Sequence, residues 1–480
     1  IGMKILVIGG TGTVGSAINV MNGSSIAGGL YNTRLIQGQQ TGLLLAGGNV
    51  VGGVSNTGSI AGVTGYGISL STNSVMTGSL RNDHGYITGI NNAGSIGGIQ
   101  NYTGLIAGGI NNSGTIANEA LAVFMYHGTL TGGFTNSGVI QATSSFAGMQ
   151  LYASNLTGDL ANLGGTILGG LGGSAALSVT IDSVVTGVLT NSGMISGQVG
   201  IELYASQVAG GITNSGSIVG TSGAGVEIGA NTTLSGLNNT GYISSVSNAG
   251  FIAAINNVGG NIAGGVTNAG LIYNASGSSI TASGSTLTVA NLSDGTVAGV
   301  FGGDLSISNS GLIALQTMAG GTISAGTSLA ASITGNYVQA TSGTLQFGVN
   351  GLSGTGTIAG NYSTLSVSGS ASFAANSKLK VSMSSTTAVQ NGQTLAGVLS
   401  AGSLTTNGFS ITDNSALVDF TYATVGGVLS LIATAPTTVA CGTVSSSVQG
   451  PCLMAFNAPN VLVTGLGTIS GGSTGIRVLS

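Results

Sequence analysis

Apolar and polar residues alternate with a period of two in many short segments of the chain. The segments GMQLY (148–152), GIELY (200–204) and GVEIG (225–229) each place apolar residues two positions apart, with an outward-facing residue between them. No apolar run approaches the roughly 18 residues that a membrane-spanning helix requires. The pattern predicts an all-β protein with short strands and no membrane span.

A five-residue unit, N-x-G-x-[IV], recurs at an interval that predicts a solenoid. Its clear copies begin at Asn56, Asn92, Asn112, Asn136, Asn191, Asn214, Asn239, Asn248, Asn268 and Asn309. The main repeats are separated by 23 to 29 residues, and some of the longer steps contain extra copies about ten residues apart. A period of about 26 that divides into thirds is what a three-faced, right-handed parallel β-helix requires, with coils stacked about 4.8 Å apart.

Asn and Gly each have a physical role at the corner between two strands. Asn tolerates the left-handed backbone region and Gly adopts positive φ without cost. Stacked Asn side chains also hydrogen-bond from coil to coil. Flexible low-complexity sequence is the alternative, but it would not keep an Ile or Val in register with each corner. The repeats therefore favour the solenoid.

Composition excludes several classes of function. Gly supplies 90 of 480 residues, and charged residues make up 3%, against about 25% in ordinary soluble domains. The formal net charge is -4 and no basic patch exists, so nucleic acid is not an expected partner. Ile, Leu and Val recur at regular spacing, which argues against disorder.

The opening stretch VIGGTGTVG (7–15) has the GxxGxxG spacing of a dinucleotide-binding loop. Such a loop must open a helix whose amides meet a pyrophosphate, and here Gly23 and Gly28 interrupt any helix. The first acidic residue, which would read the ribose, is Asp83. We therefore expect no nucleotide and no other cofactor. The stretch is interpreted as a strand that caps the first coil, a joint between subunits, or a leader that is not native.

The repeats and the segments that follow them resemble the passenger of a bacterial autotransporter (type V secretion), of the pertactin-like kind. The C-terminal segments that carry the resemblance are GNYVQATSGTLQFGVNG (335–351), YSTLSVSGSASFAANSKLKVSM (362–383) and GGVLSLIATA (426–435). The resemblance implies a right-handed β-helix exported to the surface of a Gram-negative bacterium. The chain departs from the family pattern because no translocator barrel follows and no signal peptide precedes it, so we expect a released or otherwise anchored passenger.

Four segments are expected from these patterns. They are an N-terminal strand, cap or assembly segment (1–24), the repeat β-helix (25–327), a C-terminal β-helix region resembling a passenger end (328–435) and a tail (436–480). The tail contains Cys441 and Cys452, which are the two cysteines of the chain. We expect them to form a local disulfide in an exported protein, and two cysteines alone do not predict a metal site.

Two outward columns are candidates for chemistry or binding. Aligned coils place Gln150, Ser178, Glu202 and Glu227 in one column, so the two glutamates stand about 5 Å apart, the separation of a retaining glycosidase pair. Two solvated glutamates without further catalytic groups are the simpler interpretation. A second column, Phe124, Tyr152 and Tyr204, predicts a contact surface, or a covering of the solenoid flank. His84 and His127 are expected on the surface.

Two function classes remain open. The first is a non-enzymatic extracellular or cell-surface protein that assembles into filaments or a surface layer, and serves adhesion or a biofilm matrix. Its expected partners are copies of itself, with glycans or a neighbouring cell surface as further partners. The second is a β-helix that binds or cleaves polysaccharide with Glu202 and Glu227. Because 16 charged residues in 480 repel one another weakly, the sequence favours self-association.

Overall fold

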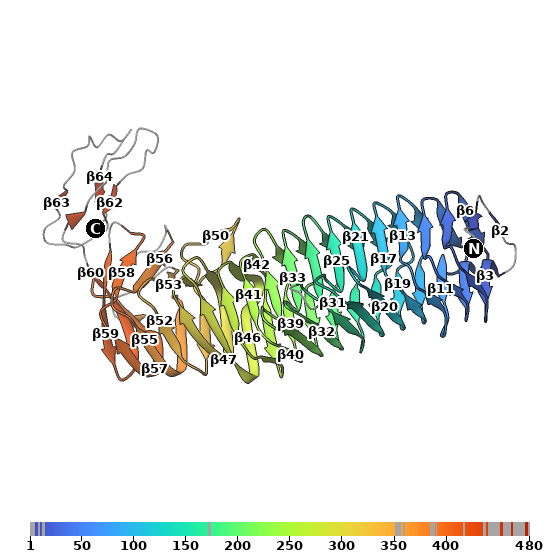
Figure 1. Ribbon diagram of the computed structural model, residues 1–480. Helices are drawn as coiled ribbons and strands as arrows, with labels where there is room; N and C mark the ends of the chain where they lie inside the picture. Colours follow the sequence, from blue (N-terminus) through green and yellow to red (C-terminus); the bar gives the residue numbers. More distant parts are fainter. Residues whose placement is uncertain are drawn as a thin grey trace. The chain divides into compact units, whose positions relative to one another are not determined.

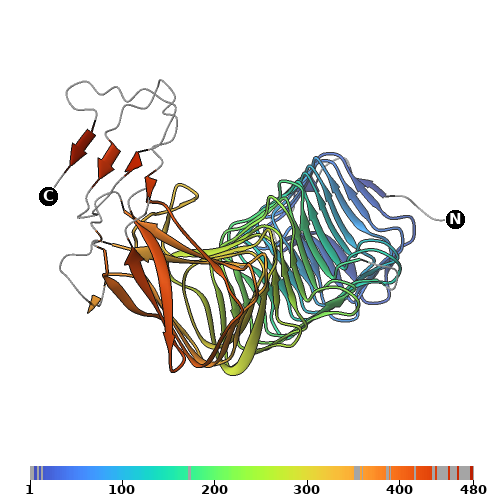
Figure 2. The ribbon, with the colours of Figure 1, turned by 90° about the vertical axis from the view of Figure 1, so that its left-hand side faces the viewer.

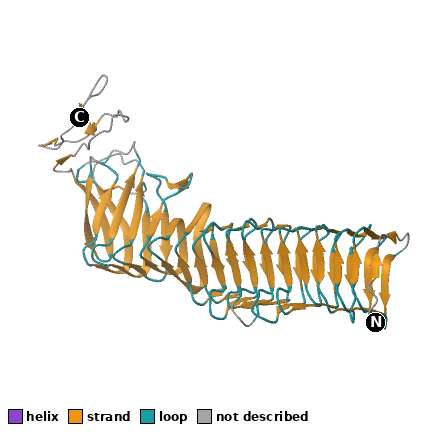
Figure 3. Ribbon diagram, turned by 45° about the horizontal axis from the view of Figure 1, so that its top comes forward, coloured by secondary structure: helices purple, strands orange, loops and turns teal. Residues whose placement is uncertain are grey.

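The computed structural model describes most of the chain, which forms two compact units. Described with side chains are residues 15–170, 174–350, 361–384, 389, 391–415 and 418–434; for 5–7, 10–11, 357–358, 438–439, 452–454, 462–463 and 476–478 the backbone alone is described. The first unit contains Ile1–Gly270 with Ser283–Leu287, and the second contains Leu271–Ala282 with Thr288–Ser480. Strands joined by turns and loops make up both units, and the described residues include no helix (Figure 3).

The first unit is a parallel β-helix in which each strand pairs with the fourth strand before it and the fourth after it (Figure 1). The four stacks of paired strands are called columns 1 to 4. Column 1 contains β1 (Ile5–Val7), β5 (Leu30–Asn32), β9 (Val54–Asn56), β13 (Leu80–Asp83), β17 (Ile99–Tyr102), β21 (Val123–Tyr126), β25 (Met149–Tyr152), β29 (Leu177–Thr180), β33 (Ile201–Tyr204), β37 (Val226–Ile228), β41 (Val246–Asn248) and β45 (Val266–Asn268). Column 2 contains β2 (Gly10–Thr11), β6 (Leu35–Gly38), β10 (Ser59–Gly62), β14 (Tyr86–Ile87), β18 (Leu105–Ile106), β22 (Thr129–Thr131), β26 (Asn155–Thr157), β30 (Val184–Val185), β34 (Gln207–Val208), β38 (Thr233–Leu234) and β42 (Phe251–Ile252).

The remaining half of each coil consists of a column 3 strand followed by a column 4 strand. Column 3 contains β3 (Ser16–Met21), β7 (Thr41–Ala46), β11 (Ile68–Leu70), β15 (Ile90–Asn92), β19 (Ile110–Asn112), β23 (Phe134–Asn136), β27 (Leu160–Asn162), β31 (Leu189–Asn191), β35 (Ile212–Asn214), β39 (Leu237–Asn239) and β43 (Ile255–Val258). Column 4 contains β4 (Ser25–Ile26), β8 (Asn49–Val50), β12 (Val75–Met76), β16 (Ser95–Ile96), β20 (Thr115–Asn118), β24 (Val139–Ala142), β28 (Thr166–Leu168), β32 (Met194–Gly197), β36 (Ser217–Gly220), β40 (Tyr242–Ile243) and β44 (Asn261–Ile262). In Figure 2 these coils, coloured from blue to green, are wound one behind another.

The parallel β-helix is confirmed, but a coil of the first unit has four strands where the sequence predicted three. Coil length also varies: buried Asn side chains that bond between neighbouring coils are 18 residues apart at Asn239 and Asn257, and 29 apart at Asn162 and Asn191. The N-x-G-x-[IV] unit occurs at the end of both column 1 and column 3. Its ten-residue copies are therefore half-coils, not thirds.

Buried apolar side chains fill the interior of every coil. The strands of column 2 from β6 to β42 each contribute one such residue, for example Ile60, Ile87 and Leu130, all with no exposed area. Burial of one such side chain contributes roughly 1.5–3 kcal/mol. The parallel register places each of these residues against its equivalent in the next coil, as with Ile60 and Ile87. The core is thus a continuous apolar column that no single coil could form alone.

Asn ladders line the corners of the first unit. The column 3 ladder runs through Asn92, Asn112, Asn136, Asn162, Asn191, Asn214, Asn239 and Asn257, each donating from Nδ2 to the next Oδ1 at 2.7–2.8 Å. Column 1 has the same ladder at Asn32, Asn56, Asn82 and Asn101, and again from Asn248 to Asn268. Between these two stretches the equivalent column 1 positions are apolar and buried: Met125, Leu151, Val179, Leu203 and Ile228.

The backbone of the opening stretch continues the stack. β1 pairs in parallel with β5, placing Ile5 opposite Leu30, and β2 pairs with β6. The rest of the glycine motif, apart from Gly15, lies outside the residues described with side chains. Its expected role as a cap or a joint therefore stays a prediction.

The second unit is a β-helix that ends in an antiparallel hairpin. Its parallel strands are β46 (Leu271–Asn291), β47 (Thr296–Asn309), β48 (Leu312–Leu315), β51 (Ala330–Ile333), β52 (Tyr337–Gln339), β53 (Thr344–Val349), β54 (Thr357–Ile358), β55 (Thr364–Phe373), β56 (Lys378–Met383), β57 (Thr394–Thr406) and β58 (Ser410–Asp413). Antiparallel pairs are β49 (Met318–Ala319) with β50 (Thr322–Ile323), and β59 (Asp419–Val425) with β60 (Val428–Thr434). β60 also pairs with β57, so the parallel stack meets an antiparallel strand there.

The tail contributes four short strands, β61 (Thr438–Val439), β62 (Cys452–Met454), β63 (Leu462–Val463) and β64 (Ile476–Val478), which pair as β61 with β63 and β62 with β64. Cys441 and the side chain of Cys452 lie outside the described residues, so the expected disulfide stays a prediction. Within the described part of the chain, no helix is long and apolar enough to cross a membrane.

A candidate contact face on column 1

Six consecutive strands of column 1, β13 to β33, end in an unusual corner. Each of them is followed by a non-glycine residue in the left-handed backbone region: His84, Thr103, His127, Ala153, Ile181 and Ala205 have φ between 46° and 57°. Such a conformation costs roughly 1 kcal/mol or more for a residue with a side chain. Each of these residues donates its backbone N–H to a carbonyl of the next coil, for example His127 to Tyr152 at 3.0 Å. The coil-to-coil ladder therefore holds the corner in place.

This corner brings three rows of side chains to one surface, which we call the contact face. The central row is Arg81, Gln100, Phe124, Gln150, Ser178, Glu202 and Glu227, all in register. The edge row is Asp83, Tyr102, Tyr126, Tyr152, Thr180 and Tyr204. The turn row consists of the residues that follow, including His84, His127 and the pair Ile181–Asp182.

Aromatic rings gather in the middle of the contact face. Tyr126 and Tyr152 stack with ring centroids 5.4 Å apart and an interplanar angle of 18°. Tyr102 meets Phe124 edge-on at 5.6 Å, and His127 meets Tyr126 edge-on at 4.4 Å. Such pairs contribute about 0.5–1.5 kcal/mol each beyond area burial. The rings stay accessible, since Tyr126 is 38% exposed.

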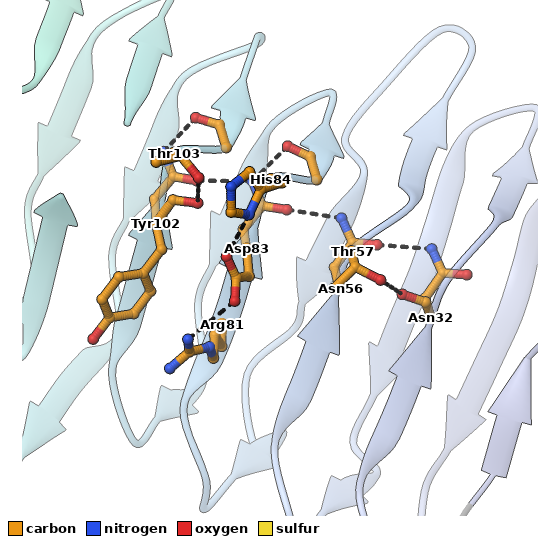
Figure 4. A network of polar contacts seen from close by, with 12 residues as sticks. Asn32, Asn56, Thr57, Arg81, Asp83, His84, Tyr102 and Thr103 are labelled. Carbon is orange, nitrogen blue, oxygen red and sulfur yellow. Dashed lines mark hydrogen bonds and ion pairs between the residues drawn. The ribbon is translucent and has the colours of Figure 1, made fainter. Parts of the chain in front are cut away.

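A polar cluster lies at one end of the contact face (Figure 4). Asp83 accepts from Arg81 at 3.0 Å and contacts His84 Nδ1 at 2.7 Å. These hydrogen bonds, that of Arg81 first, lower the pKa of the Asp83 carboxyl below its usual value. The Arg81 guanidinium also lies 4.3 Å from the ring centroid of Tyr102. Arg81 and His84 are exposed, so both are accessible to a partner.

The sequence-predicted glutamates lie side by side. Glu202 pairs in register with Glu227, and Ser178 in the preceding coil donates its hydroxyl to Glu202 Oε2 at 2.9 Å. Both glutamates are partly exposed. The structure thus brings two carboxylates and a hydroxyl together on a flat, open strand column.

The predicted aromatic column differs from the observed one at a single residue. Phe124 lies in the central row, in register with Gln150, whereas Tyr152 and Tyr204 lie in the edge row with Tyr126. Side chains two positions apart on a strand share a face, so Phe124 and Tyr126 both point outward and the sequence did not separate them. Tyr126 is the edge-row residue of that coil.

Sequence reasoning missed Arg81, Tyr102 and Tyr126 as members of this surface and left His84 and His127 without a role. A local signal exists in hindsight: the segments NDHG (82–85), NYTG (101–104) and MYHG (125–128) have the same order of residues after the strand. Each combines a buried residue, an outward side chain, a left-handed residue and a buried Gly.

Charge is concentrated on the contact face and is ordered along it. In the described part of the first unit, the charged residues are Arg34, Arg81, Asp83, Glu119, Asp159, Asp182, Glu202 and Glu227, of which five belong to this face. Both histidines of the chain also lie here. The basic groups occupy the coils of β13 to β21, together with Asp83, which pairs with Arg81, and the carboxylates of Asp182, Glu202 and Glu227 occupy the coils of β29 to β37.

A groove of about 620 Å³ runs beside the column 4 strands β24, β28, β32 and β36. Its lining includes Gln141, Leu168, Ser196 and Gln198, and it contains no ionisable side chain. Across the described residues, no three His, Cys, Asp or Glu side chains are placed to hold a metal ion. The contact face is therefore the stronger candidate site.

No protein-family model matches the chain, and no curated protein is similar to it. The resemblance to an autotransporter passenger accordingly rests on the sequence pattern. What the structure itself establishes is a long parallel β-solenoid with Asn ladders.

Proposed function

We propose that this protein is a non-enzymatic, extracellular structural protein that associates with copies of itself and thereby builds a filament or a surface layer. The observation that carries the proposal is the contact face, where aromatic rings and charged groups gather on an otherwise nearly uncharged scaffold. Exposed aromatic and charged residues concentrated on one surface are typical of interaction sites.

The framework suits a structural role. Buried Asn ladders and a continuous apolar core tie each coil to its neighbours, so the contact face is held on a regular support. The autotransporter-like pattern adds a location, the surface of a Gram-negative bacterium, where such a protein would mediate adhesion or build a biofilm matrix. Glycans and neighbouring cells are further partners under this proposal.

Association of the ends of the solenoid is a second contact mode within the proposal. Parallel strands at the end of a solenoid leave backbone groups that another copy can pair with by strand addition. The pairing of β1 and β2 with the first coil places strand-like backbone at that end.

Sedimentation velocity over a wide concentration range, with electron microscopy of the same samples, tests the proposal. We expect the weight-average sedimentation coefficient to rise with concentration and particles longer or wider than one copy to appear. A chain that stays monomeric at the highest soluble concentration would refute self-assembly.

The second candidate function is polysaccharide cleavage by Glu202 and Glu227. The observation in its favour is their register, because neighbouring strands lie about 4.8 Å apart and a retaining pair needs about 5 Å. The Glu202→Gln and Glu227→Gln variants, assayed for release of reducing ends from a polysaccharide panel, decide it. Activity that both variants abolish would establish this candidate, and activity unchanged or absent in the parent would remove it.

A further inference from the structure

We infer that two copies pair face to face through the contact face in opposite directions, about a two-fold axis that crosses Gln150. The inference rests on the proposed self-association and specifies the surface and the symmetry. A two-fold axis parallel to the strands reverses the order of coils and leaves each row facing its own equivalent row. The middle of the seven strands that carry the central row is β25, so β13 faces β37, β17 faces β33, and β21 faces β29.

The central row is self-complementary under this operation. Arg81 of one copy comes opposite Glu227 of the other, and Gln100 comes opposite Glu202, since all four occupy the same row. Gln150 meets its own equivalent at the axis, where two amides can exchange hydrogen bonds. The two-fold symmetry generates each of the other contacts twice.

The edge row places aromatic rings opposite one another, Tyr102 opposite Tyr204 and Tyr152 opposite its own equivalent, and it has one position of complementary shape. Thr180 interrupts the row of tyrosines, which leaves a gap of roughly two coil spacings, about 9–10 Å, between the strands that bear Tyr152 and Tyr204. Tyr204 leans away from this gap, because its ring covers Gly229 of the following coil. The two-fold axis places the exposed Tyr126 of the partner opposite Thr180. An aromatic side chain of one copy thus enters the place where the other copy lacks one.

The turn row adds a polar pair. His127 follows β21, and Ile181 and Asp182 follow β29, so the imidazole of one copy comes opposite the carboxylate of the other. Asp182 and His127 are both exposed. A histidine N–H donor and a carboxylate acceptor form a charge-assisted hydrogen bond at this position.

The order of charges along the central row favours antiparallel pairing of the two copies over parallel pairing. A two-fold axis along the solenoid would place each central-row residue opposite itself, so Glu202 would face Glu202 and Glu227 would face Glu227. Like charges directly opposed are destabilising, and opposite charges are stabilising. Asp83 also lies on β13, where it pairs with Arg81 of the same copy. The central row has its basic residue on β13 and its two carboxylates on β33 and β37, and this row therefore favours the reversed pairing.

The area predicts a modest affinity. Seven strands about 4.8 Å apart and roughly 15 Å wide bury about 500 Å² per copy. A standard stable interface buries about 800 Å² per partner. We therefore expect a dimer that dissociates in the micromolar range, and that higher ionic strength weakens.

Charge reversal tests the pairing directly. Arg81→Glu and Glu227→Arg should each weaken dimerisation by tenfold or more in sedimentation velocity, because each places like charges opposite one another. The double variant R81E/E227R should restore it, since position 81 of each copy comes opposite position 227 of the other. Glu119→Arg makes the same change of charge away from the contact face and should dimerise like the parent. Circular dichroism of each variant checks that the fold is kept.

Thiol cross-linking tests the symmetry. Gln150→Cys should give a covalent dimer with a short bis-maleimide, above the background of the parent chain with its own cysteines. Asn238→Cys, an exposed position on column 3, should not. If the chain associates, but charge reversal does not weaken the association and Gln150→Cys gives no covalent dimer, this interface is wrong while self-assembly stands. A chain that never associates refutes both.

Discussion

Removal of one side chain of the Asn ladder should lower the stability of the protein far more than removal of the adjacent side chain on the same strand. Asn239 and Asn238 are adjacent in β39, but Asn239 is 1% exposed and Asn238 faces solvent. Asn239 accepts from Asn214 at 2.8 Å, and it donates to Asn257 at 2.8 Å and to the carbonyl of Gly241 at 3.1 Å. Asn239→Ala and Asn238→Ala therefore form a matched pair.

The magnitude follows from these contacts. Two buried hydrogen bonds and one partly buried one, each contributing about 1 kcal/mol net, give a loss of about 3 kcal/mol for Asn239→Ala. The amide of Asn214 keeps its bonds to the carbonyls of Gly216 and Tyr242, which limits the damage on that side. On the other side, the Oδ1 atom of Asn257 loses the hydrogen bond that the Asn239 amide donates to it. Asn238→Ala should change stability by no more than about 0.5 kcal/mol.

The effect should be local, because each coil of a solenoid contacts only its neighbours. Hydrogen exchange measured by mass spectrometry should show faster exchange in the coils around β35, β39 and β43 for Asn239→Ala. A loss of about 3 kcal/mol corresponds to roughly a hundredfold rise in the opening equilibrium. Equal stability and equal exchange for the two variants would refute the reasoning that the ladder stabilises the corner.

Three further outcomes are expected. Mass spectrometry of non-reduced, exported protein should show Cys441 joined to Cys452, and two free thiols would contradict this. Burial raises the pKa of Asp413 to about 6; a Ser415 N–H lowers it and the charge of Asp419 raises it. Between about pH 4 and pH 6 the folded state therefore keeps a proton on Asp413 that the unfolded state has released. The free energy of unfolding of the second unit should fall as the pH rises through this range, and in Asp413→Asn this pH dependence should be absent. Deletion of residues 1–16 should abolish end-to-end assembly and leave the circular dichroism of the β-helix unchanged; assembly that survives the deletion would exclude the joint.

The sequence alone predicted the parallel β-helix, because its determinants are local. Alternation with a period of two sets each strand, and Asn with Gly two residues later sets each corner. A chain that repeats a short strand and a corner can bury the apolar face of each strand only by stacking one coil on the next. The sequence also predicted that Glu202 and Glu227 lie in one row, because the coils that precede them are nearly equal in length.

Only the tertiary structure decided which corner each Asn occupies. The same unit marks the end of column 1 at Asn56 and the end of column 3 at Asn136, so a list of repeats counts half-coils and coils together. Coil length varies from 18 to 29 residues, and loops between strands absorb the difference. Register between coils is set by backbone hydrogen bonds and by contact between buried side chains.

The contact face shows the same division. A sequence reveals that Phe124 and Tyr126 both point outward, since they are two residues apart. The pairing of Tyr126 with Tyr152, and the gap that Thr180 leaves before Tyr204, exist only between coils. Such features depend on which residues the stacking brings into register, and a one-residue difference in loop length would change them.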